Sequence, residues 1–168
     1  ELILQRELPH QQKAVDAISA VFRGVKITAP ANYYENPQIV LSDPRLAENI
    51  KEIQKGIPAE HRNSTQKGDC LNLDIKMETG TGKTYVYTNA IYELHKLYGF
   101  NKFIIAVPSL AIKAGTAQFL QDDYVKRHFS DVCGYGTQIE LGVLEAPKNK
   151  KKGKSYFPGV VSEFFKGS

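Results

Sequence analysis

The run Met77-Glu78-Thr79-Gly80-Thr81-Gly82-Lys83-Thr84 constrains the fold of this chain more than any other feature. Its two glycines allow backbone turns that a Cβ atom disfavours, so that successive N–H groups can surround the oxygens of a phosphate. Lys83 adds a positive charge for the β- and γ-phosphates, and the hydroxyl of Thr84 is a ligand for Mg²⁺. A helix that begins here contributes its positive N-terminal end. The run therefore predicts a loop that binds the phosphates of a nucleotide.

The match to the pattern G-x-x-x-x-G-K-[ST] is incomplete, because Met77 stands where the first glycine is expected. Residues 79–84 nevertheless match the Thr-Gly-x-Gly-Lys-Thr core that is typical of nucleic-acid translocases of helicase superfamily 2. These proteins often carry another residue in place of that glycine. The alternative is a glycine-rich turn without a ligand, and the segments on either side of the loop disfavour it.

The segments that flank the loop have the patterns of a strand and a helix. Residues 70–76 alternate between apolar and polar side chains, which predicts a strand that leads directly into the loop. Apolar residues from Val86 to Tyr98 recur at helical spacing, and Gly99 follows as a stop signal. Residues 103–107 then form a continuous apolar run of the kind found in buried parallel strands. This order predicts a βαβ unit.

Candidate residues for a contact with nucleic acid follow the second predicted strand in the sequence. Ser109 can cap a helix that continues to about residue 124. Pro108, Ser109 and Lys113 then lie at a carboxyl end of the predicted sheet, where open α/β folds bind ligands. A contact with a phosphate backbone and a plain helix cap explain these residues equally well.

A first helix is predicted over residues 8–22, with Pro9 at its start and Gly24 after its end. The side-chain amide of Gln11 near its start offers one donor and one acceptor, which suit the edge of an adenine. The alternative is a solvated residue at a helix start. The phosphate loop downstream favours the adenine contact.

Residues 25–69 are less regular and are interpreted as an insertion packed on the edge of the domain. Three proline-containing turns punctuate this stretch. A short amphipathic helix is predicted inside it, capped by Asp43 and with Pro44 at its first position.

Residues 119–123 resemble, at first sight, an apolar strand that ends in an acidic pair for Mg²⁺. Gln118 and Gln121 interrupt the apolar run, and its spacing is helical, so a helix is predicted instead.

A lysine-rich segment stands near the C-terminus, with five lysines in residues 148–154. Apolar residues alternate before it and aromatic residues follow it, which predicts a β-hairpin over about residues 137–162 with a basic tip. Such a tip can grip phosphates, but a solvated loop is the favoured interpretation.

Composition limits the class of protein only broadly. The 168 residues, 42% of them hydrophobic and 24% charged, suit one globular α/β domain. No run is long and apolar enough for a membrane span and no signal peptide is recognised, so a cytoplasmic location without a membrane partner is expected.

Cys70 and Cys133 indicate neither a zinc site nor a disulfide framework. The net charge of +4 permits a polyanionic partner without requiring one, and a start at Glu1 indicates a piece of a longer protein.

Three stretches together resemble the helicase-like restriction subunit of type III restriction-modification enzymes. They are Leu8-Pro9-His10-Gln11-Gln12-Lys13-Ala14-Val15, Leu73-Asp74-Ile75-Lys76 before the loop, and residues 103–113. The resemblance implies an α/β fold, namely a RecA-like P-loop NTPase domain that is the first motor domain of a superfamily 2 helicase. Its sheet is expected to be mostly parallel and flanked by helices. The resemblance implies that residues 1–168 are the N-terminal part of this domain, truncated before the Walker B motif.

The resemblance also implies a function and a set of site residues. The full-length protein would couple ATP hydrolysis to DNA translocation or switching and to double-strand cleavage, with Mg²⁺ as cofactor. Its partners would be double-stranded DNA and the methyltransferase (modification) subunit. The implied nucleotide-binding residues are Gln11 of the Q-motif and Thr79, Gly80, Thr81, Gly82, Lys83 and Thr84 of motif I, with Lys83 and Thr84 catalytic and Thr84 on the metal. Pro108, Ser109 and Lys113 would lie near motif Ia, on DNA.

The resemblance further implies that the acidic motif II, the second RecA-like domain and the nuclease domain have no counterpart in these residues. Binding of nucleotide without turnover is therefore expected of this part alone.

Three alternatives remain open from the sequence. A superfamily 2 helicase or translocase without a nuclease domain shares the same motifs. A small-molecule kinase uses the same loop but needs a lid with arginines, and this chain has five arginines in all. A noncatalytic DNA-binding module would rely on the lysine-rich segment.

Overall fold

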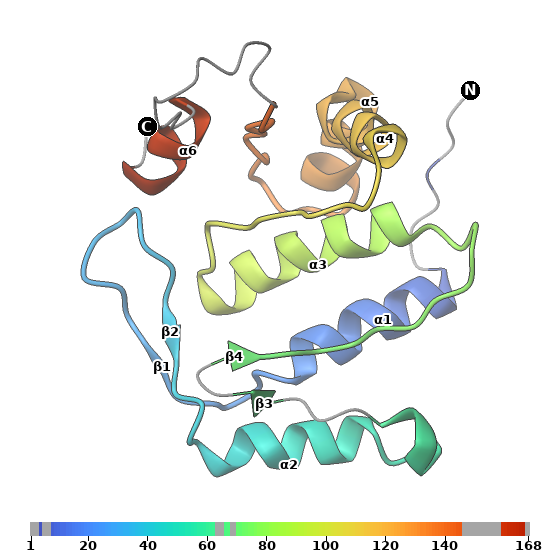
Figure 1. Cartoon of the computed structure of the whole chain (residues 1–168), viewed down its shortest axis with the longest axis vertical. Coiled ribbons are helices and arrows are strands. Elements are labelled where there is room, and N and C mark those ends of the chain that lie inside the picture. The colour runs from blue at the N-terminus through green and yellow to red at the C-terminus, as the bar shows by residue number, and fades with distance from the viewer. Residues whose placement is uncertain (1–3, 5–7, 63–65, 68–69, 146–158, 167–168) are drawn as a thin grey trace, which may run out of the picture. The chain divides into compact units, whose positions relative to one another are not determined.

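The structure is a computed structural model that describes residues 4, 8–62, 66–67, 70–145 and 159–166. These residues divide into two units: Glu1–Pro30 with Pro37–Phe100, and Ala31–Asn36 with Asn101–Ser168. Figure 1 shows the elements of each unit. Within the part of the chain so described, no helix has the length and apolar character needed to cross a membrane.

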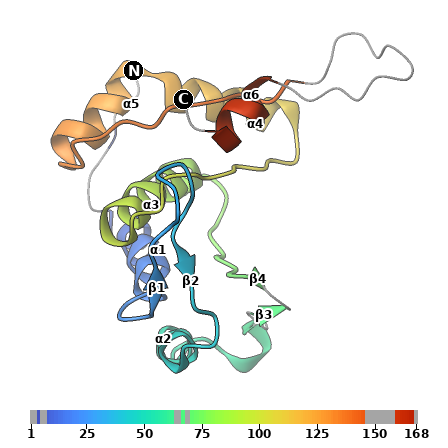
Figure 2. The same ribbon diagram turned by 90° about the vertical axis from the view of Figure 1, so that its left-hand side faces the viewer.

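The first unit is built on two long helices that lie side by side. Helix α1 (Pro9–Ala20) packs along α3 (Lys83–Tyr98), as Figure 2 also shows. The remaining elements of this unit are α2 (Pro44–Ile53), η1 (Ala59–His61), β1 (Ile27–Thr28), β2 (Gln38–Ile39), β3 (Gln66–Lys67) and β4 (Cys70–Leu71). Strands β1 and β2 pair antiparallel, as do β3 and β4.

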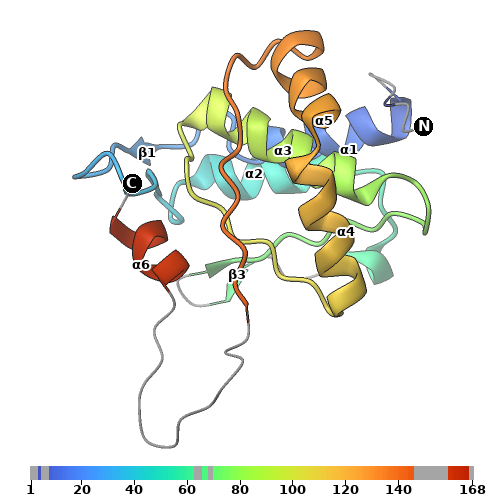
Figure 3. The same cartoon turned by 90° about the horizontal axis from the view of Figure 1, so that it is seen from above.

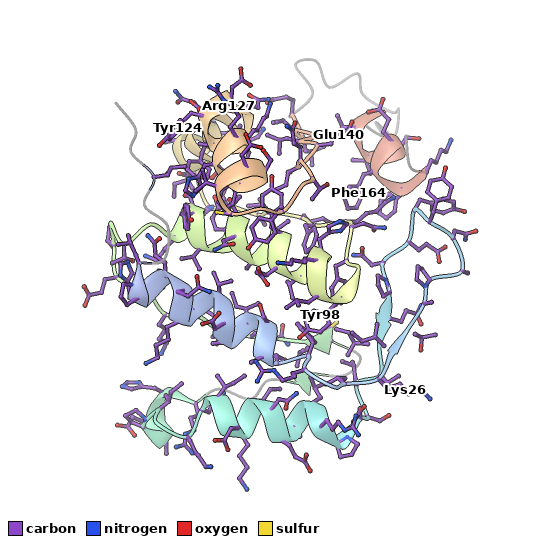
Figure 4. All side chains as sticks on the ribbon, turned by 180° about the vertical axis from the view of Figure 1, so that it is seen from behind. Lys26, Tyr98, Tyr124, Arg127, Glu140 and Phe164 are labelled. Atoms are coloured by element: carbon purple, nitrogen blue, oxygen red, sulfur yellow. The ribbon has the colours of Figure 1, made fainter. Side chains whose placement is uncertain are left out.

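Apolar side chains from the predicted helical faces form the core of the first unit. Val21, Phe22 and Val25 at the end of α1 pack with Leu46 of α2, and all four are buried. The rings of Phe22 and Tyr98 meet edge to face, with centroids 5.7 Å apart. The Tyr98 hydroxyl, labelled in Figure 4, donates to the Ser19 carbonyl at 2.6 Å, and burial raises the pKa of Tyr98. The predicted helices over residues 8–22 and 86–98 are confirmed, and Gly99 ends α3 with a left-handed φ of 77°.

Helix α2 confirms the helix predicted inside residues 25–69. Asp43 is its N-cap and accepts from Arg45 N at 3.0 Å, and Pro44 occupies the first position. The same carboxylate also accepts from Lys26 N at 2.7 Å. The backbone hydrogen bond from Lys26, followed by that from Arg45, lowers the pKa of Asp43 below its ordinary 3.8.

The second unit contains the helices α4 (Leu110–Gln121), α5 (Asp123–Arg127) and α6 (Gly159–Lys166), and the π-helical turn η2 (His128–Val132). Figure 3 shows α4 leading into α5. Ser109 caps α4 by accepting from Ile112 N at 3.3 Å, as predicted. Residues 119–123 are helical except for Asp122, which caps α5, so the rejection of an acidic strand there is confirmed.

Of the predicted α/β fold, the described residues show the helices but not the mostly parallel sheet. Of residues 70–76, β4 holds only Cys70–Leu71, and its partner β3 is antiparallel. Residues 103–107 belong to no strand, although their burial alternates and Ile104 is 81% exposed. An apolar run carries the propensity for a strand, but a sheet also needs a hydrogen-bonded neighbour. That neighbour is a non-local contact, which the pattern does not specify.

The hairpin predicted over residues 137–162 is described only at its two ends. The lysines of residues 148–154 lie outside the described residues. Before them, residues 137–145 are not assigned to a strand, and after them Gly159–Lys166 form the helix α6. The lysine-rich tip stays a prediction.

Candidate nucleotide-binding site

The predicted phosphate loop lies between β4 and α3 and has the backbone that its glycines permit. Gly80 and Gly82 adopt φ values of 79° and 83°, in the left-handed region that favours glycine. The Thr81 hydroxyl donates to the Glu78 carbonyl at 2.7 Å and closes the turn. Helix α3 then begins at Lys83 without a side-chain cap. The start of a helix, where backbone N–H groups lack partners within the helix, is a favourable place for an anion.

Lys83 and Thr84 stand at the start of α3, where the sequence places them. Lys83 is exposed and makes no ion pair with any residue that the structure describes. Thr84 is half-buried, and its carbonyl accepts from the Thr88 hydroxyl at 2.8 Å within the helix. The described residues contain no group of three or more His, Cys, Asp or Glu side chains arranged to hold a metal ion. The role of the Thr84 hydroxyl as a ligand of Mg²⁺ stays a prediction.

Gln11 contacts the loop directly. Its side chain is 8% exposed, and Nε2 donates to the Thr81 carbonyl at 3.1 Å. A Cβ atom added to Gly82 would lie 2.3 Å from this nitrogen, so Gln11 fills the space that the glycine leaves. The Oε1 atom of Gln11 is buried and has no hydrogen-bond partner among the residues that the structure describes. Because such an atom normally costs stability, it is a position where a ligand can supply the missing donor.

Gln12, the neighbouring amide, does not take part. Its Nε2 donates to Asp16 Oδ1 at 2.7 Å, four residues further along α1. The geometry thus distinguishes the two glutamines, and only Gln11 reaches the loop.

His10 is a contact of the loop that the sequence did not indicate. Its exposed ring lies with Nε2 3.2 Å from the same Thr81 carbonyl oxygen. Its position next to Gln11 at the start of α1 was the one available signal. The two side chains reach Thr81 from 71 and 70 residues away in the sequence.

The predicted nucleic-acid residues belong to the second unit, and two of them, Ser109 and Lys113, have partners inside it. Ser109 is the cap of α4. Lys113 Nζ donates to the Leu144 carbonyl at 2.6 Å and lies 3.2 Å from Glu145 Oε1. Pro108 is exposed. The helix cap is therefore confirmed for Ser109, while the contact of these residues with DNA stays a prediction.

Known proteins with a similar sequence agree on one family. Residues 6–157 match the family described as "Type III restriction enzyme, res subunit". The Res subunit of the EcoPI enzyme of Escherichia phage P1 is 40% identical over 169 residues, and that of the EcoP15I enzyme of Escherichia coli is 39% identical over 170 residues. The StyLTI Res subunit of Salmonella typhimurium is 41% identical over 164 residues.

The matches cover almost all of this chain but little of the relatives. Each of the first two spans 98% of the chain and 17% of the relative, and the third spans 96% and 14%. The family carries a helicase-like P-loop NTPase fold, which accords with a phosphate loop at the start of α3. The chain belongs to the family of the res subunits of type III restriction enzymes.

Proposed function

We propose that this chain is the ATP-binding part of the motor domain of a type III restriction endonuclease subunit. The full-length protein then couples ATP hydrolysis to DNA translocation or switching and to double-strand cleavage. The observation that carries the proposal is the pairing of an uncapped α3 N-terminus with the buried, unpartnered Oε1 of Gln11 beside the same loop. One feature suits the phosphates of a nucleotide, and the other suits its base.

At the phosphate end, Lys83 and the first N–H groups of α3 bind the β- and γ-phosphates. Lys83 has no carboxylate partner in the described residues, so its charge is available to them. The Thr84 hydroxyl is the protein ligand of Mg²⁺. When bound, the ion neutralises part of the charge that develops as the γ-phosphate is transferred.

At the base end, Gln11 distinguishes adenine from guanine. Its Oε1 accepts from the N6 amino group of adenine, and the second hydrogen on Nε2 faces N7. Guanine presents the acceptor O6 in place of the amino group, so its pairing with Oε1 fails. Because the other hydrogen of Nε2 is donated to Thr81, one residue connects base recognition with the loop.

The proposal also includes a sheet, a contact with DNA and a partner subunit. Residues 70–76 and 103–107 are strands of the sheet of the full-length motor domain. The 81% exposure of Ile104 supports this, since a sheet neighbour would cover it. Pro108, Ser109 and Lys113 contact double-stranded DNA. A modification subunit supplies sequence specificity, and the enzyme acts in the cytoplasm. Lys113 must then leave Glu145 to reach a phosphate.

Nucleotide binding to the full-length protein tests this proposal. Wild type should prefer ATP to GTP. Gln11→Ala should weaken ATP binding by roughly 5- to 150-fold, corresponding to about 1–3 kcal/mol for an unsatisfied polar group, and should weaken GTP binding less. Gln12→Ala is the matched control and should change ATP affinity by less than about twofold. Equal affinity of wild type for ATP and GTP, or a larger loss from Gln12→Ala, would contradict the assignment of Gln11.

A further inference from the structure

We propose that His10 is a positioning residue of the phosphate loop. Together with Gln11 it fixes the orientation of the peptide group between Thr81 and Gly82, and thereby the direction of the Gly82 N–H group. This inference rests on the proposed function, because it assumes that the loop binds the phosphates of a nucleotide. It adds a role at the phosphate end for a residue outside the loop.

Two donors from the first turn of α1 converge on one carbonyl oxygen. His10 Nε2 lies 3.2 Å and Gln11 Nε2 3.1 Å from Thr81 O. A carbonyl oxygen has two lone pairs, so the two side chains together fill its capacity as an acceptor. The contact requires hydrogen on His10 Nε2, which both the corresponding neutral tautomer and the imidazolium provide.

The orientation of this carbonyl decides where the next N–H group points. All described peptide bonds are trans, and the C=O and N–H of a planar trans peptide point in opposite directions. With the Thr81 carbonyl turned toward α1, the Gly82 N–H is turned away from α1. Gly82, which carries this N–H group, directly precedes Lys83 at the start of α3.

The loop needs such an external contact because its own backbone resists rotation only weakly. Glycines flank Thr81 on both sides, and both have positive φ. Glycine reaches several backbone conformations at similar energy, so the peptide between Thr81 and Gly82 is not fixed by local sterics alone. The hydrogen bond from the Thr81 hydroxyl to the Glu78 carbonyl fixes the side chain of Thr81 but not the carbonyl of Thr81. The carbonyl itself is held by His10 and Gln11.

The two positioning contacts differ in how they affect ligand choice. Gln11 also presents the unpartnered Oε1, so its loss affects adenine more than guanine. His10 is exposed, and its ring hydrogen-bonds to the Thr81 carbonyl and to no other group among the described residues. Its loss should therefore weaken every ligand with the same phosphates equally, whatever the base.

The test uses full-length protein and three ligands with Mg²⁺: ATP, GTP and inorganic triphosphate. His10→Ala should weaken binding of all three by the same factor, about 2- to 12-fold for one neutral hydrogen bond. His10→Gln replaces the ring donor by an amide donor and should restore affinity to within about twofold of wild type. Gln12→Ala, one residue beyond Gln11, should leave all three affinities unchanged.

Several results would overturn the inference. They are unchanged affinities in His10→Ala, a loss confined to ATP, and a loss that His10→Gln does not restore. Any of these leaves the proposed function standing, provided that wild type binds ATP. Failure of wild type to bind any of the three ligands overturns the proposed function and this inference together.

Discussion

Gly80 and Gly82 have nearly the same φ, 79° and 83°, but different surroundings, and this difference gives a sharp test of the loop. A Cβ at Gly80 would meet nothing within 4 Å, whereas one at Gly82 would lie 2.3 Å from Gln11 Nε2. Both substitutions with alanine incur the conformational cost of positive φ, roughly 1–2 kcal/mol. Gly82→Ala also displaces the Gln11 amide from the Thr81 carbonyl.

Gly82→Ala should therefore weaken ATP binding about 2- to 12-fold more than Gly80→Ala, which is the contribution of one lost hydrogen bond. Equilibrium titration of both full-length variants with ATP measures the difference. If the two variants lose the same affinity, Gln11 does not support the loop.

Lys83→Ala in the full-length protein should abolish ATP hydrolysis and DNA cleavage together. The lysine charge stabilises the phosphates most strongly in the transition state, and removal of one such group typically costs about 10²–10³ in rate. Because Lys83 is exposed, the fold should survive, which circular dichroism can check. Cleavage that continues without hydrolysis would show that the nuclease is not coupled to the motor.

At the scale of elements, the helices were predictable from sequence because their signals are local. Pro44 and the caps Asp43 and Ser109 mark the starts of α2 and α4, and Gly99 marks the end of α3. Each acts through backbone groups within a few residues. Residues 103–107 were not predictable in the same way, because a strand is defined by a partner that lies elsewhere in the chain.

The candidate site was likewise predictable where its residues are close in sequence and not where they are far apart. The loop residues are contiguous, so the sequence predicts them together. The contact of His10 and Gln11 with Thr81 joins α1 to the loop across about seventy residues, and no spacing indicates it. The adenine role of Gln11 was predicted, but its contact with the loop and the contribution of His10 emerge from the packing of α1 along α3.

The cap of α2 gives a prediction about stability and pH. The pKa of Asp43 is lowered in the folded protein, so the ionised carboxylate stabilises the fold. Its contribution is complete well above the unfolded pKa and is lost as the pH falls through the lower, folded pKa. Asp43→Asn removes the charge at every pH but keeps an acceptor for the cap.

Thermal melting of wild type and Asp43→Asn should therefore show a less stable variant at pH 7. The difference should shrink as the pH falls below the ordinary value of 3.8, where the wild-type carboxylate becomes protonated. A difference that stays constant down to the lowest pH would contradict a role for the charge.

At the scale of the whole molecule, the described residues contain a phosphate loop but not a complete sheet. The strands β1 to β4 form two separate antiparallel pairs, and residues 103–107 have no strand partner among the described residues. The chain spans about a sixth of the length of the relatives it matches. Different parts of a full-length subunit would therefore contribute to ATP binding and to ATP hydrolysis. The two properties can be measured separately on residues 1–168.

Residues 1–168 alone should bind ATP but hydrolyse it no faster than background. Phosphoryl transfer in P-loop motors uses an acidic residue that holds Mg²⁺ and an arginine that stabilises the transition state. The sequence resemblance places the acidic motif and the arginines of the second motor domain outside these residues. In the proposed function, the loop and Lys83 bind the phosphates and Gln11 binds the base, and all of these groups lie within residues 1–168. Measurement of ATP binding and of phosphate release, with and without DNA, separates the two properties, and full-length protein serves as the positive control. DNA-stimulated turnover by residues 1–168 would show that this part already contains every group needed for hydrolysis.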